Sequence, residues 1–127
     1  MMTIDEAGLK AMSLPDVSEV TRYGNRTWAV RGKAFAWDRP FSKADIKRFG
    51  SEPVPTGPIL AVRVADLVDK DAVLSSRRKG VFTIPHFDGF AAVLIDLSIA
   101  TKRTVIEAIE DAWMAVAGTE LPRSFRR

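Results

Sequence analysis

The sequence predicts an α+β domain, a two-layer sandwich with helices on one face of a largely antiparallel, five-stranded sheet. Hairpin-like strand pairs predict the antiparallel sheet, amphipathic stretches predict the helices, and 127 residues make one domain. The predicted order is α-β(3)-α-β(2)-α, with a short helical insertion between strands 2 and 3. We assign residues 1–118 to this domain, with the insertion at about 42–58, and residues 119–127 to a basic C-terminal tail.

The chain begins with a predicted helix over residues 4–13. Thr3 and Glu6 have the spacing of a capping box at its start. Pro15 ends it, because a residue that precedes proline avoids the helical conformation. We interpret residues 15–26, which include Tyr23 and Gly24, as a connector.

A β-hairpin follows, with strands at 27–30 and 33–37 joined by Arg31-Gly32. The alternation of side chains places Phe35 and Trp37 on the same strand face. A short helix then begins at Ser42 and ends at Gly50. The Pro- and Gly-rich segment 53–58 cannot be a central strand and is predicted to be a stiff loop.

The second half alternates strands and helices. Strands are predicted at 59–64, 81–85 and 91–97, and a helix at about 67–76, capped by Asp66 or Asp69. The longest helix begins after Thr101 or Thr104 and ends at Gly118. Its apolar residues recur at helical spacing, so this helix is expected to cover the sheet.

The 19 basic and 16 acidic residues give a net charge of +3, and they are unevenly placed. Segment 22–48 combines eight basic residues with two acidic ones, and three more cations follow at 77–79. Such cations could bind the phosphates of a nucleic acid, or they could be a solvated sheet edge and a charged helix end. The candidate nucleic-acid-binding residues are Arg22, Arg26, Arg31, Lys33, Arg39, Lys43, Lys47, Arg48, Arg77, Arg78 and Lys79.

Composition excludes several chemistries. With no cysteine and one histidine, disulfides, thiolate chemistry and multi-histidine metal sites are excluded. No phosphate-binding glycine motif or nucleophile elbow occurs. We therefore expect no catalytic residue, no cofactor and no metal. The N-terminus lacks the features of a signal peptide, so we expect a cytoplasmic protein without a membrane partner.

The aromatic residues and the lone histidine have two interpretations each. Tyr23, Trp28, Phe35 and Trp37 lie among the cations, where they could stack on bases or form the core. Similarly, His86 and Asp88 could be an acid–base pair or two metal ligands, or Asp88-Gly89 could form a turn. Trp113 on the longest helix is expected to be core.

Several of these segments together resemble the MmcQ/YjbR family. They are Tyr23-Gly24, the stretch from Ile84 to Phe90 (Ile-Pro-His-Phe-Asp-Gly-Phe), and the Asp-Ala-Trp of the last helix. The resemblance runs from about Leu14 to Gly118, and segment 42–58 looks like an insertion found in part of the family. It implies a secretion-chaperone-like α+β fold and DNA binding, in some members with a double-wing motif. The positions that match the family motifs are Tyr23, Gly24, His86, Asp88, Gly89 and Trp113.

Three hypotheses about function follow. The first is a small, non-catalytic protein that binds DNA weakly and electrostatically through its basic hairpin region. The second is a protein-interaction module, for example a homodimer formed through a sheet face or edge. The third is a small-molecule site near His86 and Asp88.

Overall fold

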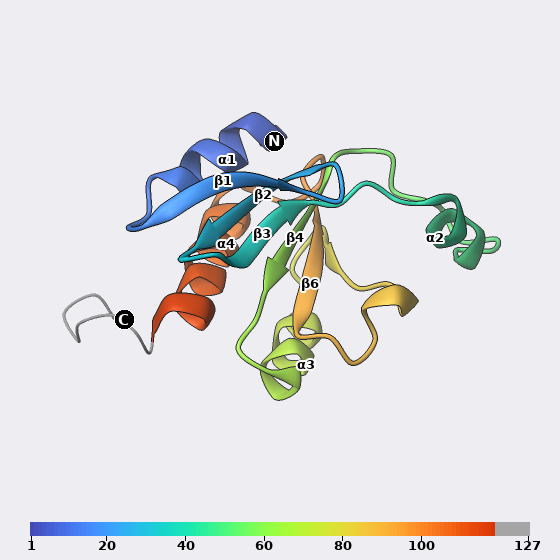
Figure 1. The fold of residues 1–127 in the computed structure, drawn as a ribbon. Helices are drawn as coiled ribbons and strands as arrows, with labels where there is room; N and C mark the ends of the chain where they lie inside the picture. Colours follow the sequence, from blue (N-terminus) through green and yellow to red (C-terminus); the bar gives the residue numbers. More distant parts are fainter. Residues whose placement is uncertain (119–127) are drawn as a thin grey trace.

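The computed structural model describes residues 1–118, and it confirms the α+β class with an open antiparallel sheet. The sheet has six strands in the order β1-β2-β3-β4-β6-β5 (Figure 1). The elements are α1 (Ile4–Met12), β1 (Val17–Arg22), β2 (Asn25–Val30), β3 (Lys33–Asp38), α2 (Lys43–Arg48), β4 (Ile59–Arg63), α3 (Leu67–Ser75), β5 (Val81–Phe82), the 3-10 turn η1 (Pro85–Phe87), β6 (Ala92–Asp96) and α4 (Lys102–Ala117). The predicted tail, 119–127, lies outside the described residues.

The predicted connector 15–26 is wrong, because it contains the edge strand β1. This strand pairs antiparallel with β2, from Val17 opposite Val30 to Arg22 opposite Asn25. Tyr23 and Gly24 both have positive φ, which makes the link between the strands a type I′ turn. Five of the six β1 residues are exposed, so the strand lacks the apolar alternation that marks a half-buried strand. The predicted insertion consequently lies between the third and fourth strands.

The second hairpin, β2–β3, is confirmed, and it also turns through a type I′ pair, Arg31-Gly32. Its ladder shifts register, however, since Trp28 pairs with Ala36 whereas Ala29 pairs with Ala34. This β-bulge leaves Phe35 without a partner and reverses the alternation beyond it. Phe35 and Trp37 therefore lie on opposite faces of the sheet, and the prediction that they share a face is wrong.

The first face of the sheet, covered by helices, carries the larger core. Trp28, Phe35, Leu60 and Ile95 pack there against α1 and α4, and α3 adds partly buried side chains. Helices α1 and α4 also contact each other, and both lie well away from α2 in Figure 1. The prediction that helices cover one face is thus confirmed for the three longer helices.

The second face carries a smaller cluster. Ile59, Ala61 and Leu94 point to this side, because they alternate along β4 and β6 with residues of the larger core. Phe87 of η1 completes the buried cluster, and Phe41 and Phe49, which flank α2, pack against it. The insertion and η1 cover only part of this face. The rest of it contains the candidate site.

A side-chain cap marks the start of each α-helix among the described residues. Thr3 with Glu6 and Ser42 with Asp45 form reciprocal capping boxes, and the side chains of Asp66 and Thr101 cap α3 and α4. Strand β5 is shorter than predicted, because Pro85 begins the η1 turn and cannot donate to a ladder. No helix among residues 1–118 is long and apolar enough to cross a membrane.

Candidate functional site

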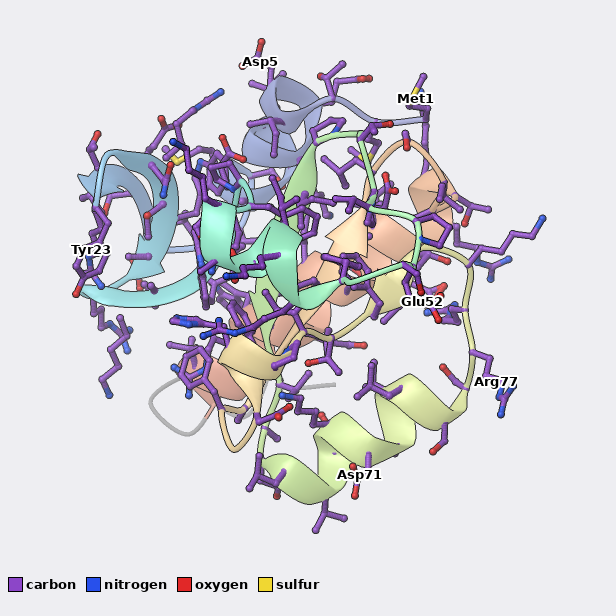
Figure 2. The ribbon with its side chains drawn as sticks, turned by 90° about the vertical axis from the view of Figure 1, so that its right-hand side faces the viewer. Met1, Asp5, Tyr23, Glu52, Asp71 and Arg77 are labelled. Atoms are coloured by element: carbon purple, nitrogen blue, oxygen red, sulfur yellow. The ribbon has the colours of Figure 1, made fainter. Side chains whose placement is uncertain are left out.

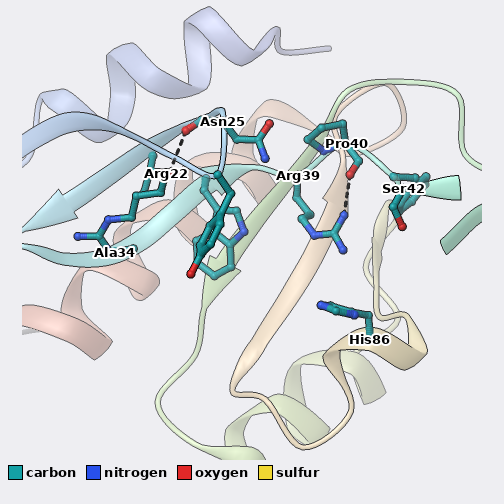
Figure 3. A pocket seen from close by; sticks show the side chains of 11 residues that line it. Arg22, Asn25, Ala34, Arg39, Pro40, Ser42 and His86 are labelled. Carbon is teal, nitrogen blue, oxygen red and sulfur yellow. Dashed lines mark hydrogen bonds between the residues drawn. The ribbon is translucent and has the colours of Figure 1, made fainter. Parts of the chain in front are cut away.

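Two adjoining cavities open beside Trp37: the larger lies on the part of the second face that no helix covers, and the smaller extends to the C-terminal part of α4. The larger has a volume of about 670 Å³ and is bounded by β1–β3, by the start of the insertion and by η1 (Figure 3). It is lined by Arg22, Tyr23, Asn25, Thr27, Ala34, Trp37, Arg39, Pro40, Phe41, Ser42 and His86. The smaller, of about 500 Å³, is lined by Arg22, Lys33, Ala34, Trp37, Arg63, Phe90, Ala115 and Val116. We give the name Trp37 face to all the residues that line one cavity or the other.

Trp37 lies where the two cavities meet, and it is half-buried. Its ring stacks on Phe87 at 6.4 Å between centroids and lies 6.2 Å from Phe90. Two guanidinium groups flank these phenyl rings, since Arg39 lies 5.6 Å from the Phe87 centroid and Arg63 lies 5.2 Å from that of Phe90. The result is an aromatic cluster with a cation on each side, held partly by cation–π attraction.

Arg39 is held firmly in the larger cavity. Its Nη1 donates to the carboxylate of Asp45 at 3.0 Å and to the carbonyl oxygen of Pro40 at 2.6 Å. Its Nε and Nη2 have no hydrogen-bond acceptor within residues 1–118. One edge of the guanidinium is thus fixed by the protein, and the other edge can bind a ligand.

Asp45 is buried, and its ion pair with Arg39 is therefore unusually well protected from solvent. Burial alone would raise the pKa of this carboxyl, but hydrogen bonds from Ser42 and Arg39 lower it below its usual value. A lowered folded-state pKa stabilises the fold at neutral pH, and that contribution is lost as the pH falls through the lowered value. Asp45 consequently holds Arg39 in place at neutral pH.

Arg22 borders both cavities. Its Nη2 donates to the carbonyl oxygen of Gly32 at 2.6 Å, so it bridges the tips of the two hairpins. Lys33, which follows the second hairpin turn, is exposed and lines the smaller cavity. None of the residues that line either cavity carries a carboxylate. The Trp37 face is therefore locally positive.

The remaining predicted cations do not join this face. Arg26 lies 5.3 Å from the Trp28 ring, on the first face, and pairs with Glu19 and Asp5. Arg31 pairs with Asp16 and Arg78 pairs with Glu107, each at 3.1 Å. The other five are exposed residues on α2 and after α3: Lys43, Lys47, Arg48, Arg77 and Lys79. Figure 2 places Arg77 on the side of the molecule opposite Tyr23.

His86 and Asp88 are not joined by a hydrogen bond. His86 is exposed in the larger cavity and has no hydrogen-bond partner among the described residues. Figure 3 shows its ring across the cavity from Arg39. Within residues 1–118, no cluster of three or more histidine or acidic residues could hold a metal ion. The arrangement contains neither the acid–base pair nor the metal site that sequence left open.

Asp88-Gly89 instead forms the turn that was the other alternative. Asp88 has φ −59° and ψ 132°, Gly89 has φ 75°, and the N–H of Phe90 donates to the oxygen of Phe87, which defines a type II turn. The buried ammonium of Lys70 donates to the oxygens of Phe87 and Phe90, at 2.6 and 2.8 Å. Lys70 thereby fixes the turn and the two aromatic rings beneath Trp37.

The predicted aromatic residues divide between the two faces. Trp28 and Phe35 are fully buried, and Trp113 is buried with its indole N–H on the oxygen of Pro15, so the core interpretation holds for these three. Tyr23, fully exposed beside Gly24, and Trp37 lie on the cavity instead. Sequence reasoning missed Arg63 and Lys70. The available signal for Arg63 was a single cation in the apolar stretch 59–64.

Comparisons with known proteins place the chain in a family. Uncharacterized protein Rv2570 of Mycobacterium tuberculosis is 38% identical over 128 residues, which cover 98% of this chain and 96% of the relative. The chain belongs to the family of this protein. Uncharacterized protein Mb2600 of Mycobacterium bovis matches equally well. No established family description matches the chain, so membership of the MmcQ/YjbR family stays a prediction.

Proposed function

We propose that this protein binds single-stranded nucleic acid, DNA in particular, weakly and without catalysis, through the Trp37 face. One observation carries the proposal: a partly exposed tryptophan lies between two cavities whose lining residues include cations and no carboxylate. The resemblance to a family named for DNA binding agrees with it. Such a ligand fits the cytoplasmic location that the sequence predicts.

The physical basis is stacking combined with phosphate binding. Each base stacked on an aromatic side chain contributes about 1–3 kcal/mol. Arg22 and Arg39 border the larger cavity and Arg63 the smaller, so successive phosphates would meet a cation on either side of Trp37. A paired base inside a duplex cannot reach a recessed ring. The face therefore favours a single strand over a duplex.

A fluorescent oligothymidine is expected to bind with a strong salt dependence. For about three phosphate contacts, the slope of log K against log salt concentration should be about −2. Trp37→Ala should weaken binding by about 5- to 150-fold, the equivalent of one lost stacking interaction. Fluorescence anisotropy at several salt concentrations measures both quantities.

Arg22→Ala removes a cation that borders both cavities, and it should reduce the affinity for oligothymidine markedly. Arg48→Ala is its matched control, because it removes an equal charge from α2, outside both cavities. The control should reduce affinity much less than Arg22→Ala does. Absence of binding at low salt would contradict the proposal. Equal affinities for Trp37→Ala and the unaltered protein would do the same.

A second candidate is self-association through β1, favoured by its position at the edge of the sheet. Arg22 and Asn25 close a two-residue turn, so alternate residues of β1, including Thr21, direct their backbone groups away from β2. A second β1 could pair with this edge. Light scattering should then give the mass of two chains, and Thr21→Pro, which removes an outward N–H, should give one. A monomer at high concentration would exclude this mode.

A further inference from the structure

We infer that the larger cavity is by itself a binding site for a free nucleoside monophosphate, with the base on Trp37 and the phosphate between Arg39 and His86. The inference deepens the proposed function, since it uses the same stacking ring. It adds that one nucleotide unit, without a polymer, is a sufficient ligand.

The size and shape of the cavity support a ligand of this kind. Its volume, about 670 Å³, lies within the usual range of about 300–1,000 Å³ for small-molecule sites. Pro40, Phe41 and Ser42 of the insertion bound it on one side. A compact ligand can therefore lie between the sheet, the insertion and η1.

The spacing of the two principal groups fits one nucleotide. Arg39 extends the β3 ladder, because its N–H donates to the oxygen of Ile59 at 2.9 Å. Residues two apart along a strand share a face and are separated by about 7 Å, so Trp37 and Arg39 lie side by side. A base on the first residue leaves its phosphate near the second.

The phosphate would meet donors that are already in place. Asp45 and Pro40 hold one edge of the Arg39 guanidinium, and its Nε and Nη2 are left for the ligand. A planar guanidinium can bind a phosphate through two such donors. Asp45 offsets the charge of Arg39, so the anion needs a further hydrogen-bond donor. His86, opposite Arg39, can supply one.

Polar groups are also available for the edge of the base. Asn25 and Ser42 both line the cavity. The side-chain amide of Asn25 has no hydrogen-bond partner among the described residues. An amide can both donate to and accept from a base. The site therefore offers a stacking surface, a fixed guanidinium edge and base-edge partners.

Isothermal titration calorimetry with AMP, adenosine and inorganic phosphate tests the inference. AMP should bind with 1:1 stoichiometry, and adenosine should bind at least tenfold more weakly because it lacks the charged hydrogen-bond acceptor. Inorganic phosphate should bind at least tenfold more weakly than AMP because it cannot stack on Trp37. If adenosine or phosphate matched AMP, the assignment of base and phosphate would be overturned.

Variants locate the ligand within the Trp37 face. Trp37→Leu should weaken AMP binding by tenfold or more. The double variant Arg39→Gln/Asp45→Asn should also do so, and it leaves no buried unpaired charge. Arg63→Gln is the matched control, since Arg63 lines only the smaller cavity. This variant should change the affinity for AMP by less than twofold, and it should weaken the binding of oligothymidine. Equal loss of AMP binding in Arg63→Gln would overturn the assigned location.

The two ligand classes separate this inference from the proposed function. If oligothymidine binds and AMP does not, the mononucleotide site is overturned and the strand-binding function stands. If AMP binds and oligothymidine does not, the mononucleotide site is supported and the strand-binding function is overturned. If neither binds, both are overturned. Circular dichroism of every variant verifies that the fold is intact.

Discussion

Replacing Trp28 with alanine is expected to destabilise the protein by about 3–5 kcal/mol, the usual loss for a large buried aromatic side chain. Trp28 has no exposed surface. Its indole N–H donates to Glu19 at 3.1 Å, and this bond is lost as well. Its ring also lies so close to α1 that a Cβ on Gly8 would come within 2.6 Å of it. The cavity left by the substitution cannot be filled without moving the helix.

Urea unfolding, followed by circular dichroism, measures this loss. Trp37→Ala is the matched control, because it removes the same side chain from a partly exposed position on the other face. We expect less than half the destabilisation there, together with the weakened nucleic-acid binding described above. Similar unfolding free energies for the two variants would mean that the two faces are wrongly assigned.

Replacing Gly80 with alanine is expected to lower the free energy of unfolding by about 2–6 kcal/mol. Its φ of 85° is costly for any residue with a Cβ, by about 1–3 kcal/mol. The added Cβ would also lie 2.8 Å from the backbone nitrogen of Ala100 and 2.9 Å from the oxygen of Asp96. Backbone atoms cannot rotate away as a flexible side chain can, so overpacking adds about 1–3 kcal/mol.

Gly24→Ala separates these two contributions. Gly24 has a similar φ of 78°, but nothing lies within 4 Å of the position that a Cβ would take. Gly24→Ala should therefore lower the free energy of unfolding only by the cost of the positive φ. Thermal and urea unfolding of the two variants, run in parallel, gives the difference. If Gly80→Ala were no worse than Gly24→Ala, the close approach of the chain to Ala100 would be contradicted.

Much of the fold could be predicted because its signals are local. A capping box needs only residues three apart, and the Thr3–Glu6 and Ser42–Asp45 pairs both form as the sequence indicates. The strand β1 could not be found in this way, since an exposed edge strand has no buried side to reveal its period. The bulge at Phe35 was equally hidden, because it depends on how β3 pairs with β2.

The site was less predictable, because the direction of each cation depends on strand register. Arg22 and Arg26 flank the same hairpin turn, yet Arg22 lines the cavities and Arg26 pairs with Glu19 on the other face. Arg22 and Arg26 are the same residue type in the same basic segment, so a count of charges cannot distinguish them. Only the pairing of β1 with β2 separates the cation that is available to a ligand from the one that is neutralised.

The 20-residue link between β3 and β4, residues 39–58, has a consequence for chain entropy. Each doubling of a loop's length adds only about 0.6 kcal/mol to the free energy of closing it. Compared with a connection of about five residues, the insertion therefore costs about 1.2 kcal/mol. The Arg39–Asp45 bond and the packing of Phe41 on Phe49 can offset that amount. The insertion, which bounds the larger cavity on one side, can thus be lengthened or replaced with little effect on whether the chain folds.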